Sequence, residues 1–191
     1  MAAFFAPIES YDFHIYYYAN YPPSRLEAIQ LKNKIFEDFA EEIEKDDLFI
    51  KVLRDETVTG PHIVAYFEVD ISDPASFLKF FSWAQLNHGS LSILVHPNSG
   101  NPFKDHTINA AWIGEKLPLK NPEDLKAYIG KSPVPWGYPN RQDIKDGFYD
   151  KPELYLKRPV YRLLRKGPID EFWSRELIDS YKELLKDYKS E

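Results

Sequence analysis

The sequence predicts an α+β fold of the ferredoxin-like class. Its elements follow the order βαββαβ along the chain, and the antiparallel sheet carries both helices on one face. An irregular C-terminal extension that ends in a helix follows. Four short segments rich in β-branched and aromatic residues predict strands, and two segments with helical spacing of apolar residues lie between them. With 191 residues and 43% hydrophobic content, the chain can bury one core. We expect one domain over residues 1–119 and an extension over residues 120–191, packed on that domain or on a dimer partner.

The first three elements follow from alternation and from helix-start signals. Residues 11–18 alternate as in a strand and end at a pair of prolines. Ser24 and Glu27 have the spacing of a capping box, which predicts a helix over about 25–45. Residues 48–53 form the second predicted strand.

The next three elements complete the sheet. A turn at Gly60 leads into a third predicted strand over residues 62–69. Asp73, followed by a proline, is the predicted N-cap of a helix that ends near Gly89. Residues 91–95 form the fourth predicted strand.

Three histidines lie on the more polar side of these predicted strands. Side chains alternate across a strand, so His14 opposes Phe13 and Ile15. By the same parity, His62 and His96 oppose the apolar residues of their own segments. All three imidazoles are therefore expected on the face away from the helices.

The predicted sheet brings these histidines to one metal site. We expect the first and third strands to run parallel at the centre, with the fourth antiparallel beside the first, so that His14, His62 and His96 meet at one end. Three protein ligands that leave open positions suit a non-haem iron. A carboxylate in place of one histidine remains the alternative. Glu68 is about 20 Å along a strand from His62 and is not expected to reach the same metal.

Composition and charge exclude several other classes of protein. The formal net charge of -6 offers no concentrated basic surface for nucleic acid. The chain has no cysteine, so any metal must be held by histidine, carboxylate or water. Residues 1–9 lack the basic start and the apolar length of a signal peptide, which predicts a cytoplasmic protein without membrane contact.

The segments that carry the histidines contain a set of motifs. They are Phe13-His14-Ile15-Tyr16-Tyr17, Gly60-Pro61-His62, Leu86-Asn87-His88-Gly89, Leu94-Val95-His96-Pro97-Asn98-Ser99-Gly100, Asp105-His106 and Ala111-Trp112-Ile113-Gly114. Over about residues 11–119 the chain resembles the DOPA 4,5-dioxygenase family. The resemblance implies a ferredoxin-like fold, a dimer, and extradiol opening of a catechol by non-haem Fe(II) and O₂. The chain has Ser99 and Asn101 where the family pattern has Thr and Asp, and His88 where it has a basic residue.

His106 and Tyr16 are the predicted catalytic residues. His106 follows a loop that leaves the fourth strand beside the expected metal, which suits a residue that transfers protons. The alternatives are a histidine bonded only to a backbone carbonyl, and an imidazole oriented by Asp105. Tyr16 shares the face of His14 and is expected to hydrogen bond a phenolic substrate. We expect His88 to cap its helix.

Two functions remain open. The first is an extradiol dioxygenase that acts on a small DOPA-like catechol with Fe(II), for which Zn(II) can substitute. The second is a non-catalytic dimeric protein that keeps the metal or ligand pocket. The open face of the sheet is too apolar to stay exposed, so we expect a homodimer partner or the extension, with its terminal helix from Pro168 to about Lys189, to cover it.

Overall fold

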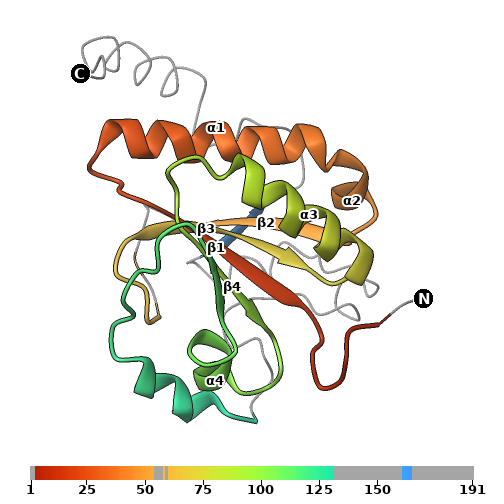
Figure 1. The fold of residues 1–191 in the computed structure, drawn as a ribbon, viewed down its shortest axis with the longest axis vertical. Helices are drawn as coiled ribbons and strands as arrows, with labels where there is room; N and C mark the ends of the chain where they lie inside the picture. The colour runs from red at the N-terminus through yellow and green to blue at the C-terminus, as the bar shows by residue number, and fades with distance from the viewer. Residues whose placement is uncertain (1–2, 54–57, 59, 131–160, 165–191) are drawn as a thin grey trace.

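The computed structural model describes residues 3–53, 58, 60–130 and 161–164. Its centre is a six-stranded sheet in the order β5-β4-β1-β3-β2-β6 (Figure 1), in which every neighbouring pair is antiparallel. The strands are β1 (Tyr11–Tyr17), β2 (Leu48–Leu53), β3 (Ala65–Ile71), β4 (Ile93–Pro97), β5 (Ala111–Ile113) and β6 (Tyr161–Leu164). The inner order β4-β1-β3-β2 confirms the predicted ferredoxin-like α+β fold.

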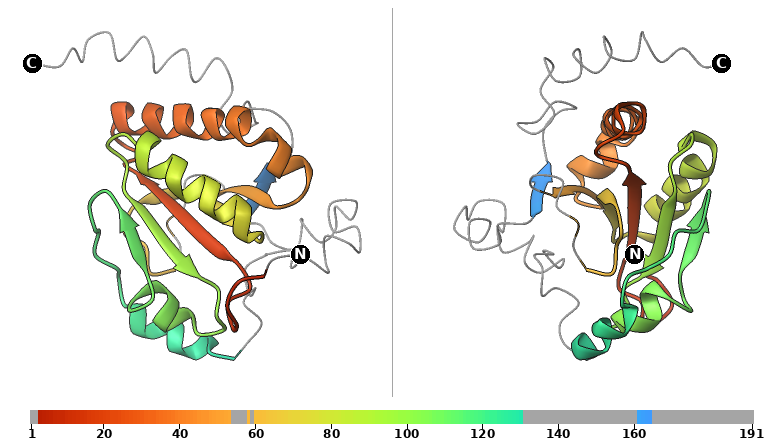
Figure 2. Two further views of the ribbon diagram at one scale, coloured as in Figure 1. Left: turned by 45° about the vertical axis from the view of Figure 1, so that its right-hand side comes forward. Right: turned by 90° about the vertical axis from the view of Figure 1, so that its left-hand side faces the viewer.

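Three helices cover one face of this sheet, as Figure 2 shows from two further directions. They are α1 (Pro22–Asp38), α2 (Ala40–Glu44) and α3 (Pro74–Asn87). Their apolar side chains pack on alternate residues of the central strands, and the members with no exposed surface include Phe13, Ile15, Ile29, Ile35, Phe67, Val69 and Phe80. Burial of this set removes a large apolar area from water, which is the main stabilising contribution to the fold.

The two long helices begin differently. At α3 the predicted cap is confirmed, because the Asp73 carboxylate accepts a hydrogen bond of 2.9 Å from the Ser76 N–H. At α1 the predicted capping box is wrong. The helix already starts at Pro22, since prolines without N–H groups suit its first turn. Ser24 instead accepts from the Tyr18 N–H at 3.1 Å.

The predicted parallel pairing of the two central strands is also wrong. β1 and β3 are antiparallel, with His14 directly opposite Glu68 and Tyr17 opposite Ala65. The reason lies in the crossover: a helix returns the chain parallel to β1 as β2, and the next strand, β3, is antiparallel to both. His62 therefore lies near the end of β1, outside β3, and Glu68 lies beside His14.

The second face of the sheet is covered by chain that follows β4. This part contains α4 (Pro102–His106), β5 and the 3-10 helix η2 (Pro122–Tyr128), which were not predicted. Tyr16, Tyr66 and Leu94 are buried there with Trp112 and neighbouring apolar residues packed against them. The expected need for a cover is thus met in part by the segment from β5 to Leu119.

The extension contributes two described elements, η2 and β6. β6 pairs with β2 at the edge of the sheet. The predicted terminal helix lies outside the described residues. Among the residues that the structure describes, no helix is long and apolar enough to cross a membrane.

Candidate functional site

Four imidazoles gather on the face of the sheet opposite α1 and α3. His14 projects from the middle of β1 and His96 from β4, while His62 precedes β3 and His106 ends α4. The ring centroid of His96 lies 5.1 Å from His14 and 3.9 Å from His106. His62 lies 4.4 Å from His14 and 5.8 Å from His106. The structure therefore brings together all four histidines that the sequence selected.

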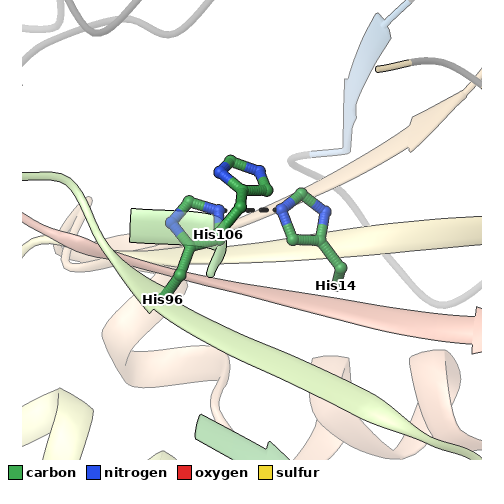
Figure 3. A group of neighbouring side chains, drawn as sticks. All are labelled: His14, His96 and His106. Carbon is green, nitrogen blue, oxygen red and sulfur yellow. Dashed lines mark hydrogen bonds between the residues drawn. The ribbon is translucent and has the colours of Figure 1, made fainter. Parts of the chain in front are cut away.

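Three of the four rings offer nitrogen atoms to one point. His14, His96 and His106 each have a ring nitrogen within 4.8 Å of the other two (Figure 3). The Nε2 atoms of His14 and His96 are 3.0 Å apart. Three imidazoles on one side of an ion leave positions free for further ligands, as in catalytic metal sites.

Backbone carbonyls fix two of these rings. His96 Nδ1 donates to the Pro97 carbonyl at 2.9 Å, and His106 Nδ1 donates to the Pro102 carbonyl at 2.9 Å. A ring that carries its proton on Nδ1 has its lone pair on Nε2. Both Nε2 atoms are therefore set to accept a metal ion or a proton.

His62 has a different partner. Its Nδ1 shares a hydrogen bond of 2.7 Å with the Tyr16 hydroxyl, and both residues are buried. Burial raises the pKa of Tyr16, so this phenol remains protonated. The hydrogen bond holds the His62 imidazole beside the other three rings.

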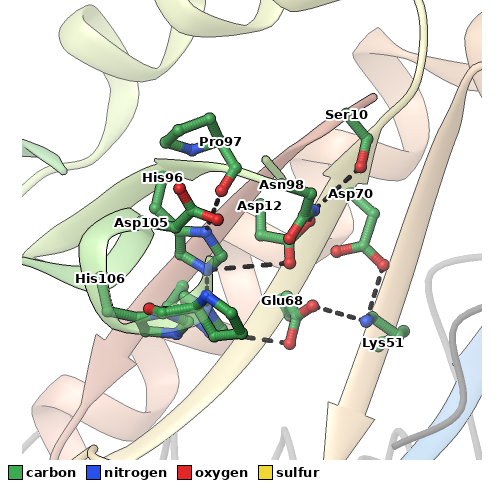
Figure 4. A network of polar contacts seen from close by, with 12 residues as sticks. Ser10, Asp12, Lys51, Glu68, Asp70, His96, Pro97, Asn98, Asp105 and His106 are labelled. Atoms are coloured by element: carbon green, nitrogen blue, oxygen red, sulfur yellow. Dashed lines mark hydrogen bonds and ion pairs between the residues drawn. The ribbon is translucent and has the colours of Figure 1, made fainter. Parts of the chain in front are cut away.

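A buried charge network lies next to the imidazoles (Figure 4). Lys51 on β2 pairs with Glu68 at 2.5 Å and with Asp70 at 2.9 Å. The second Glu68 oxygen lies 3.6 Å from His14 Nδ1. Asp12 lies 3.7 Å from His96 Nε2 and accepts a hydrogen bond of 2.7 Å from the Asn98 amide.

Burial sets the charge of these groups. It lowers the pKa of His14, His62 and His106, with further lowering by neighbouring imidazoles, and brings the pKa of His62 to about 3. Neutral imidazoles are the form that binds metal. Burial also raises the pKa of Asp12 and Asp70, and the nearby Glu68 charge adds to both.

Glu68 keeps its charge inside this network. Burial opposes ionisation of its carboxyl, but the Lys51 charge and the hydrogen bonds from Asp70 and Lys51 outweigh burial and lower its pKa. Lys51 and Glu68 thus form a neutral buried ion pair, whereas Asp70 tends to hold its proton. The two oxygens of Glu68 therefore have different partners: one faces Lys51 and the other faces His14.

The loop between His96 and His106 is held by a buried carboxylate. Asp105 accepts hydrogen bonds from the Ser99 N–H at 3.0 Å and the Ser99 hydroxyl at 2.5 Å. The Asn109 amide also donates to Asp105 at 3.2 Å. Asn101 caps α4 by accepting from the Lys104 N–H at 3.1 Å. Asp105 therefore holds the loop, and the Pro102 carbonyl orients the His106 ring.

An aromatic wall borders the imidazoles. The rings of Tyr16 and Trp112 stack with centroids 5.7 Å apart, and Tyr66 lies 4.3 Å from His62. Such surfaces suit a planar aromatic ligand. Tyr18, in contrast, is more than half exposed, and His88 is the C-cap of α3 with its Nδ1 on the Leu91 carbonyl.

Sequence reasoning missed the carboxylates of the site. Asp12, Glu68 and Asp70 share one face with His14 and His96, because residues directly opposite in antiparallel strands point the same way. Their alternation with apolar residues in β1 and β3 was a signal for them. The assumed parallel pairing hid it by placing Glu68 far from the site.

The sequence of this chain is similar to those of a known protein family and of two fungal proteins. A sequence model of the Dopa 4,5-dioxygenase family matches residues 11–122. An uncharacterized 21.2 kDa protein of Botryotinia fuckeliana is 36% identical over 118 residues, which are 58% of this chain and 60% of that protein. A DOPA 4,5-dioxygenase of Amanita muscaria is 32% identical over 136 residues, 70% of this chain and 56% of that protein. The match thus spans less than two thirds of either curated relative.

A solved structure has the same arrangement of elements. The crystal structure of a Nostoc punctiforme protein, described as a candidate dioxygenase, superposes with a TM-score of 0.53 at 29% identity. The superposition covers 63% of this chain and 93% of that one.

Proposed function

The chain belongs to the Dopa 4,5-dioxygenase family, and from this premise we propose that it opens the ring of a small, DOPA-like catechol by extradiol cleavage with non-haem Fe(II) and O₂. The family membership supports an oxygenase that acts on a small molecule together with O₂. The extradiol reaction, the iron and the catechol are the parts that we propose.

One observation carries the proposal: three imidazoles, of which His14 and His96 are buried and His106 is half-buried, present nitrogen atoms to one point, and burial lowers the pKa of His14 and His106. The His14 and His96 Nε2 atoms are 3.0 Å apart, and the His96 proton is engaged at Nδ1. Two lone pairs at this distance repel unless a proton or a metal ion lies between them. The donor set therefore fits a divalent metal, and a bound Fe(II) would supply the redox chemistry that joins O₂ to a catechol.

We assign His14, His96 and His106 as the metal ligands. The sequence had favoured His62 as the third ligand and His106 as the proton carrier. The distances support exchanging these roles, because His62 is engaged by Tyr16 and its ring nitrogens are not part of the set within 4.8 Å. The alternative, with His62 as the third ligand and His106 as the proton carrier, would be supported if His62→Ala lost the metal and His106→Ala kept it.

His62 is the proposed proton carrier, and Tyr16 orients it. Extradiol cleavage requires a group that removes and returns phenolic protons of the substrate. His62 lies beside the rings that would hold the metal, and its hydrogen bond to Tyr16 orients the ring. The rings of Tyr66 and Trp112 would bound the aromatic part of the substrate. Homodimer formation, expected from the family resemblance, stays part of the proposal.

The test is single-turnover chemistry on the full chain. Protein loaded with Fe(II) under anaerobic conditions is mixed with DOPA and then with O₂, and absorbance records the yellow ring-opened product. We expect product from the wild type and none from His96→Ala treated in the same way. Metal binding without any product from DOPA or simpler catechols would favour the non-catalytic binding protein.

A further inference from the structure

We infer that Glu68 is a positioning residue: it holds the His14 imidazole in the tautomer with the proton on Nδ1, so that the Nε2 lone pair points to the shared ligand position. The metal half of this inference rests on the proposed function. The tautomer itself does not, because it can be observed in the metal-free protein.

The sheet register places Glu68 for this role. Directly paired residues form a row across three strands, from His14 on β1 through Glu68 on β3 to Lys51 on β2. All three side chains point to the same face and are almost fully buried, with at most 4% of each residue exposed. Cross-strand neighbours in such a row are held at short distance by the backbone itself.

The other two rings of the site show what His14 lacks. Each has its Nδ1 on a backbone carbonyl, Pro97 for His96 and Pro102 for His106, which leaves Nε2 free. His14 Nδ1 is buried and, within the described part of the chain, makes no hydrogen bond. A buried polar atom without a partner is costly. The Glu68 oxygen 3.6 Å away is an acceptor that a small side-chain rotation would bring into hydrogen-bond range.

Lys51 makes Glu68 suitable as that acceptor. Its ammonium group binds one Glu68 oxygen at 2.5 Å, which keeps the carboxylate charged and turns the second oxygen toward His14. Asp70 binds the same ammonium at 2.9 Å and fixes it from the other side. A carboxylate that receives the second ring N–H of a metal-binding histidine sets the ring orientation and makes the other nitrogen a better ligand.

Two other roles for Glu68 fit the geometry less well. As a direct ligand it would have to reach the shared position, but its oxygen faces Nδ1 of His14, whereas Nε2 faces His96. As part of a second metal site with Asp12 and Asp70 it would compete with Lys51, whose ammonium already lies between Glu68 and Asp70. The positioning role uses both oxygens of Glu68, one toward Lys51 and one toward His14.

Nitrogen NMR of the imidazoles in metal-free protein gives the direct test. We expect wild-type His14 to carry its proton on Nδ1, held there by Glu68, and the His14 and His96 rings to move apart from 3.0 Å when no metal lies between their Nε2 atoms. In Glu68→Leu the acceptor is lost, and His14 should move its proton to Nε2, from which it can donate to His96 at 3.0 Å. Glu68→Gln keeps an acceptor oxygen and should largely restore the wild-type tautomer. Asp70→Asn, the matched control, alters the network without removing the acceptor and should leave the tautomer unchanged.

Metal affinity provides the second readout. Glu68→Leu should bind Co(II) about 10–100-fold more weakly than wild type, with Glu68→Gln in between. A wild-type His14 protonated on Nε2, or the same tautomer in Glu68→Leu and wild type, would overturn the inference. The wild-type spectrum decides the matter even if Glu68→Leu does not fold. If wild type binds no metal while the tautomers behave as expected, the proposed function fails and the role of Glu68 in orienting His14 stands.

Discussion

His14 and His96 face each other through their Nε2 atoms at 3.0 Å, from neighbouring antiparallel strands and across 82 residues of sequence. Both rings are buried. The arrangement follows from register, because Asp12 opposite His96 and His14 opposite Leu94 place the two histidines diagonally on one face. Two lone pairs at this distance repel, so such a pair requires a proton or a metal ion between the nitrogens.

The third metal ligand can be identified by comparing two substitutions. We expect His106→Ala to bind much less Zn(II) than wild type, because its ring nitrogen belongs to the converging set. His62→Ala should keep most of the metal. Zn(II) per chain, measured after loading and dialysis, is the readout. Loss of metal in His62→Ala with retention in His106→Ala would restore the assignment that the sequence had favoured.

Proton transfer by His62 can be separated from metal binding. If His62 carries substrate protons, His62→Gln should retain Fe(II) but lower turnover of an accepted catechol by about two to four orders of magnitude. Tyr16→Phe removes only the hydrogen bond of 2.7 Å to Nδ1 and should have a smaller effect. Turnover at the wild-type rate in an Fe(II)-loaded His62→Gln protein would show that His62 has only a structural role.

The metal-free protein should lose stability on acidification. Below about pH 6.5 the unfolded chain protonates the imidazoles of His14, His62 and His106, whose pKa values are lowered in the folded state. The raised pKa values of Asp12 and Asp70 act in the opposite direction, since the stability that they give at low pH is lost as the pH rises through them. Between pH 7.5 and pH 5.5 we expect the imidazoles to dominate and the free energy of unfolding to fall, because the pKa of about 6.5 at which they take up protons in the unfolded chain lies inside this range.

Urea unfolding at pH 7.5 and pH 5.5 measures this effect. The expected decrease is about 1.4 kcal/mol per pH unit for each net proton taken up on unfolding. His62→Gln removes one of the three imidazoles and should flatten the dependence. A free energy of unfolding that is equal or higher at pH 5.5 would contradict the burial of neutral imidazoles.

The loop that carries His106 should depend on Asp105. Asp105→Ala leaves the Ser99 N–H, the Ser99 hydroxyl and the Asn109 amide without their acceptor. We expect a loss of about 2–4 kcal/mol in the free energy of unfolding. Ser99→Ala removes one of these bonds and should cost about 1 kcal/mol. Equal stabilities of the two variants would show that the carboxylate does not hold the loop.

Local signals in the sequence were sufficient for part of the fold. Asp73 followed by a proline fixed the start of α3, because a side-chain cap and a preset backbone angle act within a few residues. Ser24 carried a similar signal and did not cap α1, since the two prolines before it already start the helix. Alternation alone placed His14, Tyr16 and His96 on the face away from the helices.

Long-range geometry was harder to predict. His62 reaches His14 from the segment that precedes β3, beside the end of β1. Because this segment is not part of a strand, the strand alternation expected at residue 62 does not determine where the His62 side chain points. Glu68 was excluded by a distance along one strand, although it lies directly opposite His14 across the sheet. The positions of both residues depend on strand direction and register, which one strand's sequence does not contain.

Elemental analysis of the full-length protein tests the central claim most directly. Wild type, His14→Ala and His96→Ala are loaded with Fe(II) anaerobically, freed of excess metal, and measured for iron per chain, with circular dichroism to confirm folding. The account predicts about one iron per wild-type chain and almost none in either variant, because two imidazoles alone hold such an ion weakly. Equal iron in all three folded proteins would contradict it.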